Sequence, residues 1–214
     1  MDYSKEAQDR MKKIQDLKDA WVIVYANNLQ WKIDIADIRE RSESDDQWWY
    51  IRDLENLMAW WGLSEFTTAG RIITHKSHGK LSFVKLRDNT WDIQICFMRD
   101  LVKFNTGREI VESITIAGEE KSAYKIAEKF SQVWDYIAVK WDLFETKHGE
   151  LTILVGEFQL MSKAVRPLPE KWHGIQDQEA IQRQRYLDMV MTDETYEKFK
   201  KRSIFLKSIR KYLD

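Results

Sequence analysis

The chain has 214 residues, of which 43% are apolar and 32% charged, and its formal net charge is −1. These values suit a water-soluble globular protein and exclude a uniformly basic chain, so any nucleic-acid site requires local clustering of cations. The single cysteine, Cys96, excludes an internal disulfide framework and a cysteine-based zinc site. No run approaches the roughly 18 consecutive apolar residues of a membrane span. The polar N-terminus lacks a signal-peptide core, so we expect a cytoplasmic protein with no membrane partner.

Residues 1–65 are expected to form an N-terminal helix followed by a connector. Residues 4–20 carry apolar side chains at three- and four-residue spacing, which is typical of an amphipathic helix, and Ser4 stands in the N-cap position. The stretch that follows mixes a short apolar run, a charged run and two tryptophan pairs. Its pattern predicts one short helix near Ile33–Arg41.

Residues 66–163 have the pattern of a β domain. Strands are predicted over Phe66–His75, Leu81–Asp88, Trp91–Phe97, Tyr136–Thr146 and Leu151–Met161, and a helix over Glu119–Gln132. A polar link joins the third strand to this helix. The order β-β-β-α-β-β is that of an OB fold, a five-stranded Greek-key barrel with a helix between strands three and four. We therefore predict a mainly β fold with flanking helices.

Residues 164–214 are predicted to leave the barrel as a linker and a helical extension. The segment 166–169 holds the only two prolines of the chain, and proline forbids a continuing helix or strand there. Helices are predicted beyond it over Gln178–Val190 and Asp193–Leu213, with Asp193 as N-cap of the second. The second helix has an apolar seam, which usually packs on a domain or a subunit.

A local basic cluster lies on the first two predicted strands. Residues 67–87 contain five Lys or Arg, two His and no carboxylate: Arg71, His75, Lys76, His78, Lys80, Lys85 and Arg87. This part of an OB fold is its usual ligand face, and clustered cations favour contact with phosphates. The same composition also suits an ordinary solvated surface.

Alternation along the strand at 81–87 separates two faces. Val84 and Leu86 share the predicted interior face, whereas Phe83 and Lys85 share the outer face. An aromatic ring among cations on an outer face suits stacking of a nucleic-acid base, which contributes about 1–3 kcal/mol per base. The alternative is an ordinary hydrophobic side chain covered by another segment.

In the third strand, Gln94 points away from its apolar neighbours Ile93 and Ile95. An outward amide can read the edge of a base by hydrogen bonding. A simple solvated glutamine is the alternative.

No motif of catalysis is present. The sequence lacks a phosphate-binding loop, a zinc-protease helix, a nucleophile elbow and a glycine-rich dinucleotide loop. We predict no catalytic residue and no metal ligand in this chain.

Several longer stretches resemble one known family. Residues 168–174 (LPEKWHG) and 182–188 (QRQRYLD) resemble the segment that joins the two domains of bacterial class II lysyl-tRNA synthetases. Residues 69–72 (AGRI), 78–88 (HGKLSFVKLRD) and 148–151 (HGEL) resemble the OB domain of that family in the right order. The resemblance covers about residues 66–214.

The resemblance implies that the OB domain binds the U-rich anticodon of tRNA-Lys. It assigns Phe83 to stacking on the central anticodon base. It assigns Arg71, Gln94 and Glu150 to the edge of that base. The basic cluster adds His78, Lys80 and Lys85 as candidate contacts to the anticodon stem-loop.

The complete family enzyme is a homodimer that activates lysine with ATP and Mg²⁺ and esterifies tRNA. Its catalytic signatures are absent from this sequence, and we expect its catalytic domain beyond residue 214. The chain is therefore predicted to be inactive alone and to need no cofactor.

Two other interpretations remain. One is a non-enzymatic OB module that binds single-stranded nucleic acid or a protein. The other is a scaffold in which surface tryptophans promote self-association.

The amounts of tryptophan and glycine are unusual. There are 10 Trp and 8 Gly, against about 7% glycine, or roughly 15 residues, in average proteins. In the family that this sequence resembles, Trp21, Trp91, Trp134 and Trp141 fall at positions that are commonly glycine. Either the sequence is engineered or UGA codons for glycine were read as tryptophan. We expect Trp91 to need a positive φ and Trp141 to overpack the barrel interior.

Overall fold

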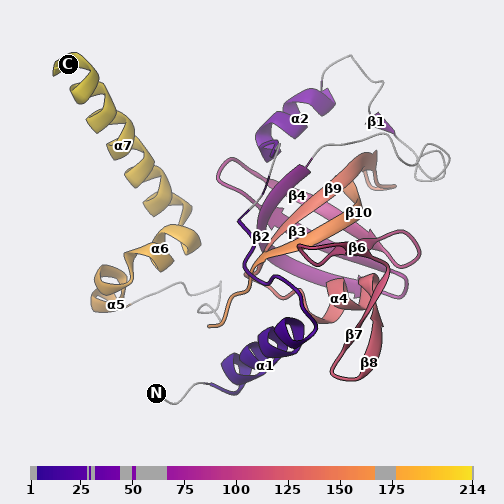
Figure 1. Cartoon of the computed structure of the whole chain (residues 1–214). Helices are drawn as coiled ribbons and strands as arrows, with labels where there is room; N and C mark the ends of the chain where they lie inside the picture. Colours follow the sequence, from indigo (N-terminus) through magenta and orange to yellow (C-terminus); the bar gives the residue numbers. More distant parts are fainter. Residues whose placement is uncertain are drawn as a thin grey trace. The chain divides into compact units, whose positions relative to one another are not determined.

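The computed structural model describes residues 4–27, 29, 32–43, 50–51, 67–166 and 177–213. The chain divides into two compact units, Met1–Arg166 and Pro167–Asp214 (Figure 1). The expected extended segment at 167–169, Phe66 and most of the connector after residue 43 lie outside the described residues.

The first unit is built on a closed ring of strands. Its members are β2 (Thr67–His78), β3 (Leu81–Arg87), β4 (Asp92–Met98), β9 (Tyr136–Glu145) and β10 (Leu151–Ser162). β2 pairs antiparallel with β3 and β9, and β3 with β4. β10 runs parallel to β4 and antiparallel to β9, which closes the ring. The predicted strand order and the OB-fold topology are confirmed. β2 extends to His78 rather than His75, because it pairs with β3 up to that residue.

Short strands follow β4 along the chain. β5 (Lys103–Asn105) and β6 (Ile110–Val111) extend the sheet of the ring, and β1 (Tyr50–Ile51) pairs with β9. β7 (Ser113–Ile116) and β8 (Glu119–Ser122) form a separate two-stranded sheet. The helix predicted from Glu119 begins only at Ala123, as α4 (Ala123–Lys129). The first residues of the predicted helix pair with β7 instead. The Ser122 hydroxyl then caps α4 by accepting from the Lys125 N–H at 3.4 Å.

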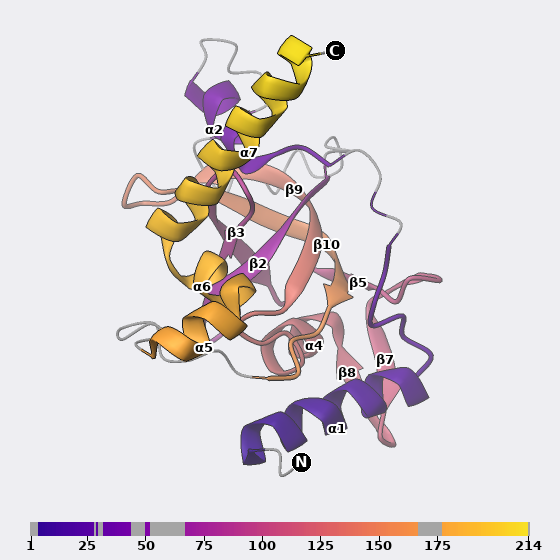
Figure 2. The ribbon, with the colours of Figure 1, turned by 90° about the vertical axis from the view of Figure 1, so that its left-hand side faces the viewer.

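Two helices lie at one end of the ring (Figure 2). α1 (Lys5–Asp19) begins at the predicted cap, where the Ser4 hydroxyl accepts from the Ala7 N–H at 3.3 Å. Leu17 of α1 and Tyr124 and Ile126 of α4 are buried in the same core as the inward side chains of the strands. The helices thus bury the apolar end of the ring.

A buried carboxylate attaches α2 (Ile35–Glu43) to the turn between β3 and β4. Asp88 Oδ2 accepts from the Ile35 N–H at 3.0 Å, and Oδ1 accepts from the Thr90 N–H at 2.7 Å. Burial opposes ionisation of Asp88, but the hydrogen bonds from Thr90 and from the Ile35, Thr90 and Trp91 backbones outweigh it. The pKa of Asp88 is therefore below its usual 3.8. The short helix predicted near Ile33–Arg41 is confirmed within two residues.

The Asp88→Asn variant tests this attachment. An amide cannot accept all of these hydrogen bonds, so we expect a loss of about 1–3 kcal/mol in unfolding free energy at pH 7. The folded pKa of Asp88 is lower than the unfolded value of about 3.8. The carboxylate therefore contributes its full stabilisation above about pH 3.8 and loses it as the pH falls through the lower, folded pKa. Urea unfolding should show the gap to wild type narrowing from pH 7 to pH 3. A gap that stays constant contradicts this. The exposed Asp100→Asn variant is the control.

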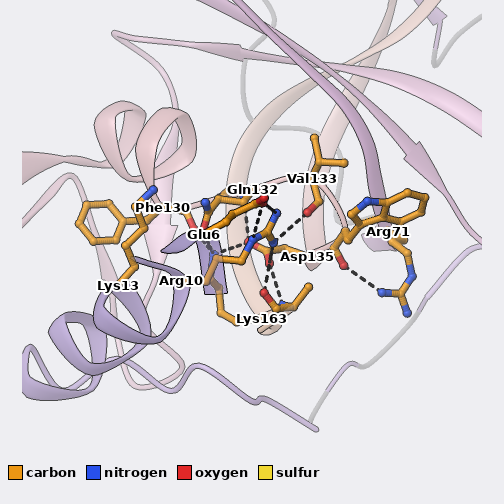
Figure 3. A network of polar contacts seen from close by, with 12 residues as sticks. Glu6, Arg10, Lys13, Arg71, Phe130, Gln132, Val133, Asp135 and Lys163 are labelled. Atoms are coloured by element: carbon orange, nitrogen blue, oxygen red, sulfur yellow. Dashed lines mark hydrogen bonds and ion pairs between the residues drawn. The ribbon is translucent and has the colours of Figure 1, made fainter. Parts of the chain in front are cut away.

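A buried ionic network joins α1 to the two ends of the β9–β10 hairpin (Figure 3). The Asp135 and Lys163 side chains are fully buried and form an ion pair. Arg10 of α1, 4% exposed, donates to the carbonyls of Val133 and Ala164 at 3.1 Å each. Burial lowers the pKa of Lys163 more than the charge and hydrogen bond of Asp135 raise it.

Lys163→Met should leave the buried Asp135 carboxylate without its hydrogen-bonded cation, so that Arg10 Nη1, 4.0 Å from Asp135 Oδ1, is the positive charge that remains beside it. Breaking one side of a buried pair typically costs about 3–5 kcal/mol. Chemical unfolding measures the loss, with Lys125→Met on the exposed side of α4 as the control. A loss below about 1 kcal/mol would show that the pair does not hold the hairpin.

Over residues 177–213, the second unit contains three helices, α5 (Gln178–Arg183), α6 (Arg185–Met191) and α7 (Asp193–Leu213). The single helix predicted over Gln178–Val190 is wrong at Gln184, whose φ of −121° and ψ of 47° separate α5 from α6. The predicted bounds of α7 are confirmed. The N-cap position is Thr192 rather than Asp193, because the Thr192 carbonyl accepts from the Tyr196 N–H at 3.1 Å.

Candidate nucleic-acid interface

The outer face of β3 carries the predicted ligand residues. Val84 and Leu86 are buried in the core, whereas Phe83 is partly exposed and Lys85 is exposed. The predicted alternation of β3 is confirmed. In β4 the same rule holds, since Ile93 and Ile95 are buried and Gln94 is partly exposed.

Strand register arranges the outer residues in rows across the sheet. The rows, in order along β3, are Arg71–Arg87–Asp92, Thr74–Lys85–Gln94–Thr152, Lys76–Phe83–Cys96–Leu154 and His78–Leu81–Met98. The β2 bulge between Ile72 and Thr74 shifts the alternation of β2 by one residue, so Thr74 rather than Ile73 lies in the row of Lys85. Neighbouring rows are two residues apart, which is about 7 Å along a strand. The structure thus brings Arg71, Phe83, Lys85 and Gln94 onto one face.

A short hydrogen-bond chain fixes the amide of Gln94. Its Nε2 donates to the Thr152 hydroxyl at 2.9 Å, and that hydroxyl donates to the Glu150 carbonyl at 3.1 Å. The hydroxyl has one proton, so Gln94 must be the donor in the first bond. Its amide oxygen is left as a hydrogen-bond acceptor. The sequence did not indicate Thr152, because only the parallel register of β4 and β10 places it beside Gln94.

Glu150 immediately precedes β10 and has an exposed side chain. Its carbonyl accepts from the Thr146 N–H at 3.0 Å, and its N–H donates to the Thr146 hydroxyl at 3.1 Å. The backbone of Glu150 therefore belongs to the chain of bonds at Gln94, while its carboxylate is accessible to solvent.

Phe83 packs on a small apolar cluster on the outer face. The cluster contains the buried Cys96, Phe144 and Leu154. Part of the ring remains exposed. The ring is therefore supported on protein on one side and partly accessible on the other. Burial raises the pKa of the Cys96 thiol in this cluster to about 12.

Asp92 partly neutralises the basic cluster. Its carboxylate accepts from Arg87 Nε at 2.6 Å and Arg87 Nη2 at 3.0 Å, and lies 3.5 Å from Lys85 Nζ. Burial opposes its ionisation, but the hydrogen bond and charge of Arg87 and the charge of Lys85 lower the pKa of Asp92 overall. This residue was missed because it follows the carboxylate-free stretch 67–87. The signal is its position directly opposite Arg87 across the turn.

The remaining predicted residues lie within β2 and at the turn that follows it. Arg71 Nη1 donates to the Trp134 carbonyl at 2.9 Å (Figure 3). His78 and Lys80 are exposed at the turn between β2 and β3, and Lys80 lies 3.9 Å from the exposed Asp100. His75 departs from the basic cluster, since its ring lies between the Ser82 hydroxyl and the Ser131 carbonyl.

Burial lowers the pKa of His75, and the bond to the Ser131 carbonyl does not offset that effect. A neutral, hydrogen-bonded imidazole contributes no charge to the outer face. Among the described residues, no group of three or more His, Cys, Asp or Glu side chains could share a metal ion. Nor is any described helix long and apolar enough to cross a membrane.

Two comparisons with known proteins agree with this geometry. A family model for tRNA anticodon domains, described as an OB-fold nucleic acid binding domain, matches residues 66–161. That range contains the ring of strands, except for the last residue of β10, and the outer face described above.

Curated relatives extend the match over nearly the whole chain. The lysine–tRNA ligase of Thermotoga maritima is 34% identical over 207 residues, which are 97% of this chain and 36% of that protein. The lysine–tRNA ligase of Magnetococcus marinus is 35% identical over 96% of this chain and 36% of its own length. That of Thermoanaerobacter pseudethanolicus is 40% identical over 148 residues, 69% of this chain and 26% of its length. The chain thus spans about a third of these relatives.

Proposed function

This chain belongs to the lysine–tRNA ligase family, and we propose that its outer face on β3, β4 and β10 binds the anticodon of tRNA-Lys. The observation that carries the proposal is the fixed Gln94 amide, one row away from the partly exposed Phe83 ring. A base stacked on Phe83 would direct its edge toward the acceptor oxygen of Gln94. The N3–H of a uracil is a donor of the kind that this oxygen takes.

Specificity would come from the bonds that hold Gln94. An amide free to rotate offers either its oxygen or its nitrogen, and so accepts more than one base. The Thr152 and Glu150 bonds leave only the oxygen available. A site with a fixed acceptor rejects bases that also present an acceptor, because two unpaired polar groups would then be buried together. Arg71 and the Glu150 carboxylate would complete the contacts around the base.

Affinity would come from the cations around the ring. Lys76 lies opposite Phe83 on β2, and Lys85 follows two residues later on β3. Cations that surround a stacking platform attract the phosphates of a single strand, and this term depends strongly on salt. His78 and Lys80 at the exposed turn extend the positive surface toward the stem of the anticodon loop.

For the whole protein, we propose ATP-dependent attachment of lysine to tRNA-Lys by a cytoplasmic homodimer. ATP and Mg²⁺ would be held by the part of the ligase that this chain does not cover. The described residues would bind and orient the anticodon, and we assign them no step of the aminoacylation reaction. The relatives carry the name of that ligase over lengths about three times the matched region.

The Phe83→Ala variant tests the stacking platform. We expect binding to a lysine anticodon stem-loop to weaken by about 1–3 kcal/mol, or roughly 5- to 150-fold, because the base loses its ring. Fluorescence anisotropy at low salt measures the affinity. Tyr25→Ala removes a 50% exposed ring elsewhere in the first unit and should leave binding unchanged. Equal affinity of Phe83→Ala and wild type would show that the Phe83 ring does not bind an anticodon base.

The central base of the anticodon separates the proposal from a general single-strand module. Wild type should prefer the cognate loop to one whose central uracil is replaced by cytosine, whose N3 is an acceptor. Gln94→Ala should reduce this preference by about 1–3 kcal/mol while it leaves binding of the mutated loop nearly unchanged. Equal binding of both loops by wild type would favour the general module.

Asp92→Asn should strengthen binding of any single strand. The change removes the negative charge of Asp92 beside Arg87 and Lys85, so the net positive charge of this face increases. We expect a several-fold gain at low salt. The slope of log K against log salt should steepen by about 0.7 for each additional phosphate contact. Glu157→Gln breaks a comparable pair with Lys140 elsewhere and is the control. Weaker binding by Asp92→Asn would indicate that the carboxylate itself contacts RNA.

A further inference from the structure

Two tryptophans have a backbone conformation that favours glycine. φ is +62° at Trp21 and +80° at Trp134, and Ala117 is the one other non-glycine with a positive φ in the described part of the chain. In this left-handed region the Cβ atom crowds the backbone, so glycine occupies it at no steric cost and bulky residues rarely do.

Trp21 directly follows Ala20, the C-cap residue of α1. The Trp21 N–H donates to the Lys18 carbonyl at 2.9 Å, and the Val22 N–H donates to the Leu17 carbonyl at 3.0 Å. These two bonds define a Schellman motif with Trp21 at its left-handed position, where glycine is usual. The apolar contact typical of the motif is also present, since Leu17 and Val22 are both buried in the core.

Trp134 occupies the third position of a tight turn. The Asp135 N–H donates to the Gln132 carbonyl at 3.0 Å, which closes a four-residue β-turn. A φ of +80° at its third residue, with no positive φ at Val133, is the geometry of a type II turn. That turn requires glycine or asparagine at this position.

The turn cannot relax to relieve a bulky residue. The Trp134 N–H donates to the Ile72 carbonyl at 2.7 Å, and the Trp134 carbonyl accepts from Arg71 at 2.9 Å (Figure 3). Asp135 is fixed by the buried Lys163. These contacts involve only the backbone of residue 134, so a glycine would keep all of them.

The indole rings themselves contribute little to packing. Trp21 is 73% exposed, and the Arg108 guanidinium lies 5.3 Å from the centroid of its ring. Trp134 is partly exposed and belongs to none of the core clusters of the described residues.

The composition of the chain also indicates that tryptophan stands at positions of glycine. Glycine is scarce and tryptophan abundant, at 8 and 10 residues. One codon connects the two amino acids, because UGA differs by a single base from UGG for tryptophan and from GGA for glycine. We propose that residues 21 and 134 are glycine in the protein that its host makes, and that their codons are UGA read by the host as glycine.

Trp91 provides the contrast. It does not have a positive φ, so the expectation that it would is wrong. Its N–H donates to Asp88 Oδ1 at 3.0 Å, and the Arg39 guanidinium lies 5.8 Å from its ring centroid. It is 59% exposed, so Trp91→Gly is a matched control in which an exposed indole is removed without relief of backbone strain. The predicted interior position of Trp141 concerns a side chain outside the described part.

Two measurements test the proposal: the gene sequence at codons 21 and 134, and the melting temperature of the full chain. The gene should carry UGA at codons 21 and 134, and UGG at either one overturns the proposal. Trp21→Gly and Trp134→Gly should each raise the melting temperature by about 2–6 °C, and the two increments should add because the sites are separate. Trp91→Gly should give no rise. If the chain with tryptophan at 21 and 134 does not fold, folding of the variant that carries both Trp21→Gly and Trp134→Gly supports the proposal instead. A melting temperature that is unchanged or lower in both single variants overturns the proposal.

Discussion

The buried ion pair of Asp135 and Lys163 is the interaction on which the first unit depends. Asp135 immediately precedes β9 and Lys163 immediately follows β10, so the pair fixes the open ends of that hairpin. β9 and β10 are also the strands that close the ring, through β2 on one side and β4 on the other. Arg10 adds α1 to the same site. One charged cluster therefore holds the helix, the hairpin and the ring closure together.

Closure of the ring determines what the outer face can present. With Val84, Leu86 and Ile95 buried inside, the side chains between them have to point outward. The ladder of β3 and β4 then sets Phe83 beside Cys96 and Lys85 beside Gln94. The parallel partner β10 supplies Thr152, which fixes the amide of Gln94. Binding residues that come from separate strands are in this way positioned by a rigid sheet rather than by mobile loops.

Local patterns in the sequence were enough to predict the ring strands, α1 and the outward direction of Phe83 and Gln94. Period-two alternation and a capping serine are local signals, and they can be recognised in the sequence without knowledge of the fold. The pattern was misleading at Glu119–Ser122, where helix-forming residues pair with β7 because a strand partner is available. It was also misleading at Gln184, whose break has no glycine or proline to announce it.

Less of the site than of the fold could be predicted from the sequence. The roles of Arg71 and Glu150 came from the family resemblance, since no local pattern selects them. Thr152 and Asp92 depend on which strands become neighbours, and a single sequence contains no such information. His75 looked like one more cation of the basic cluster, but a bulge in β2 turns it to the interior beside Ser82.

The proposed position of the anticodon loop on the outer face of β3, β4 and β10 can be observed by NMR. The ¹⁵N-labelled chain is titrated with a lysine anticodon stem-loop, and the amide chemical shifts are followed. We expect the largest shift changes at Phe83, Gln94 and Thr152 and none in α1. Changes confined to α1 and α4, with the amides of these three residues unmoved, would mean that the RNA binds elsewhere.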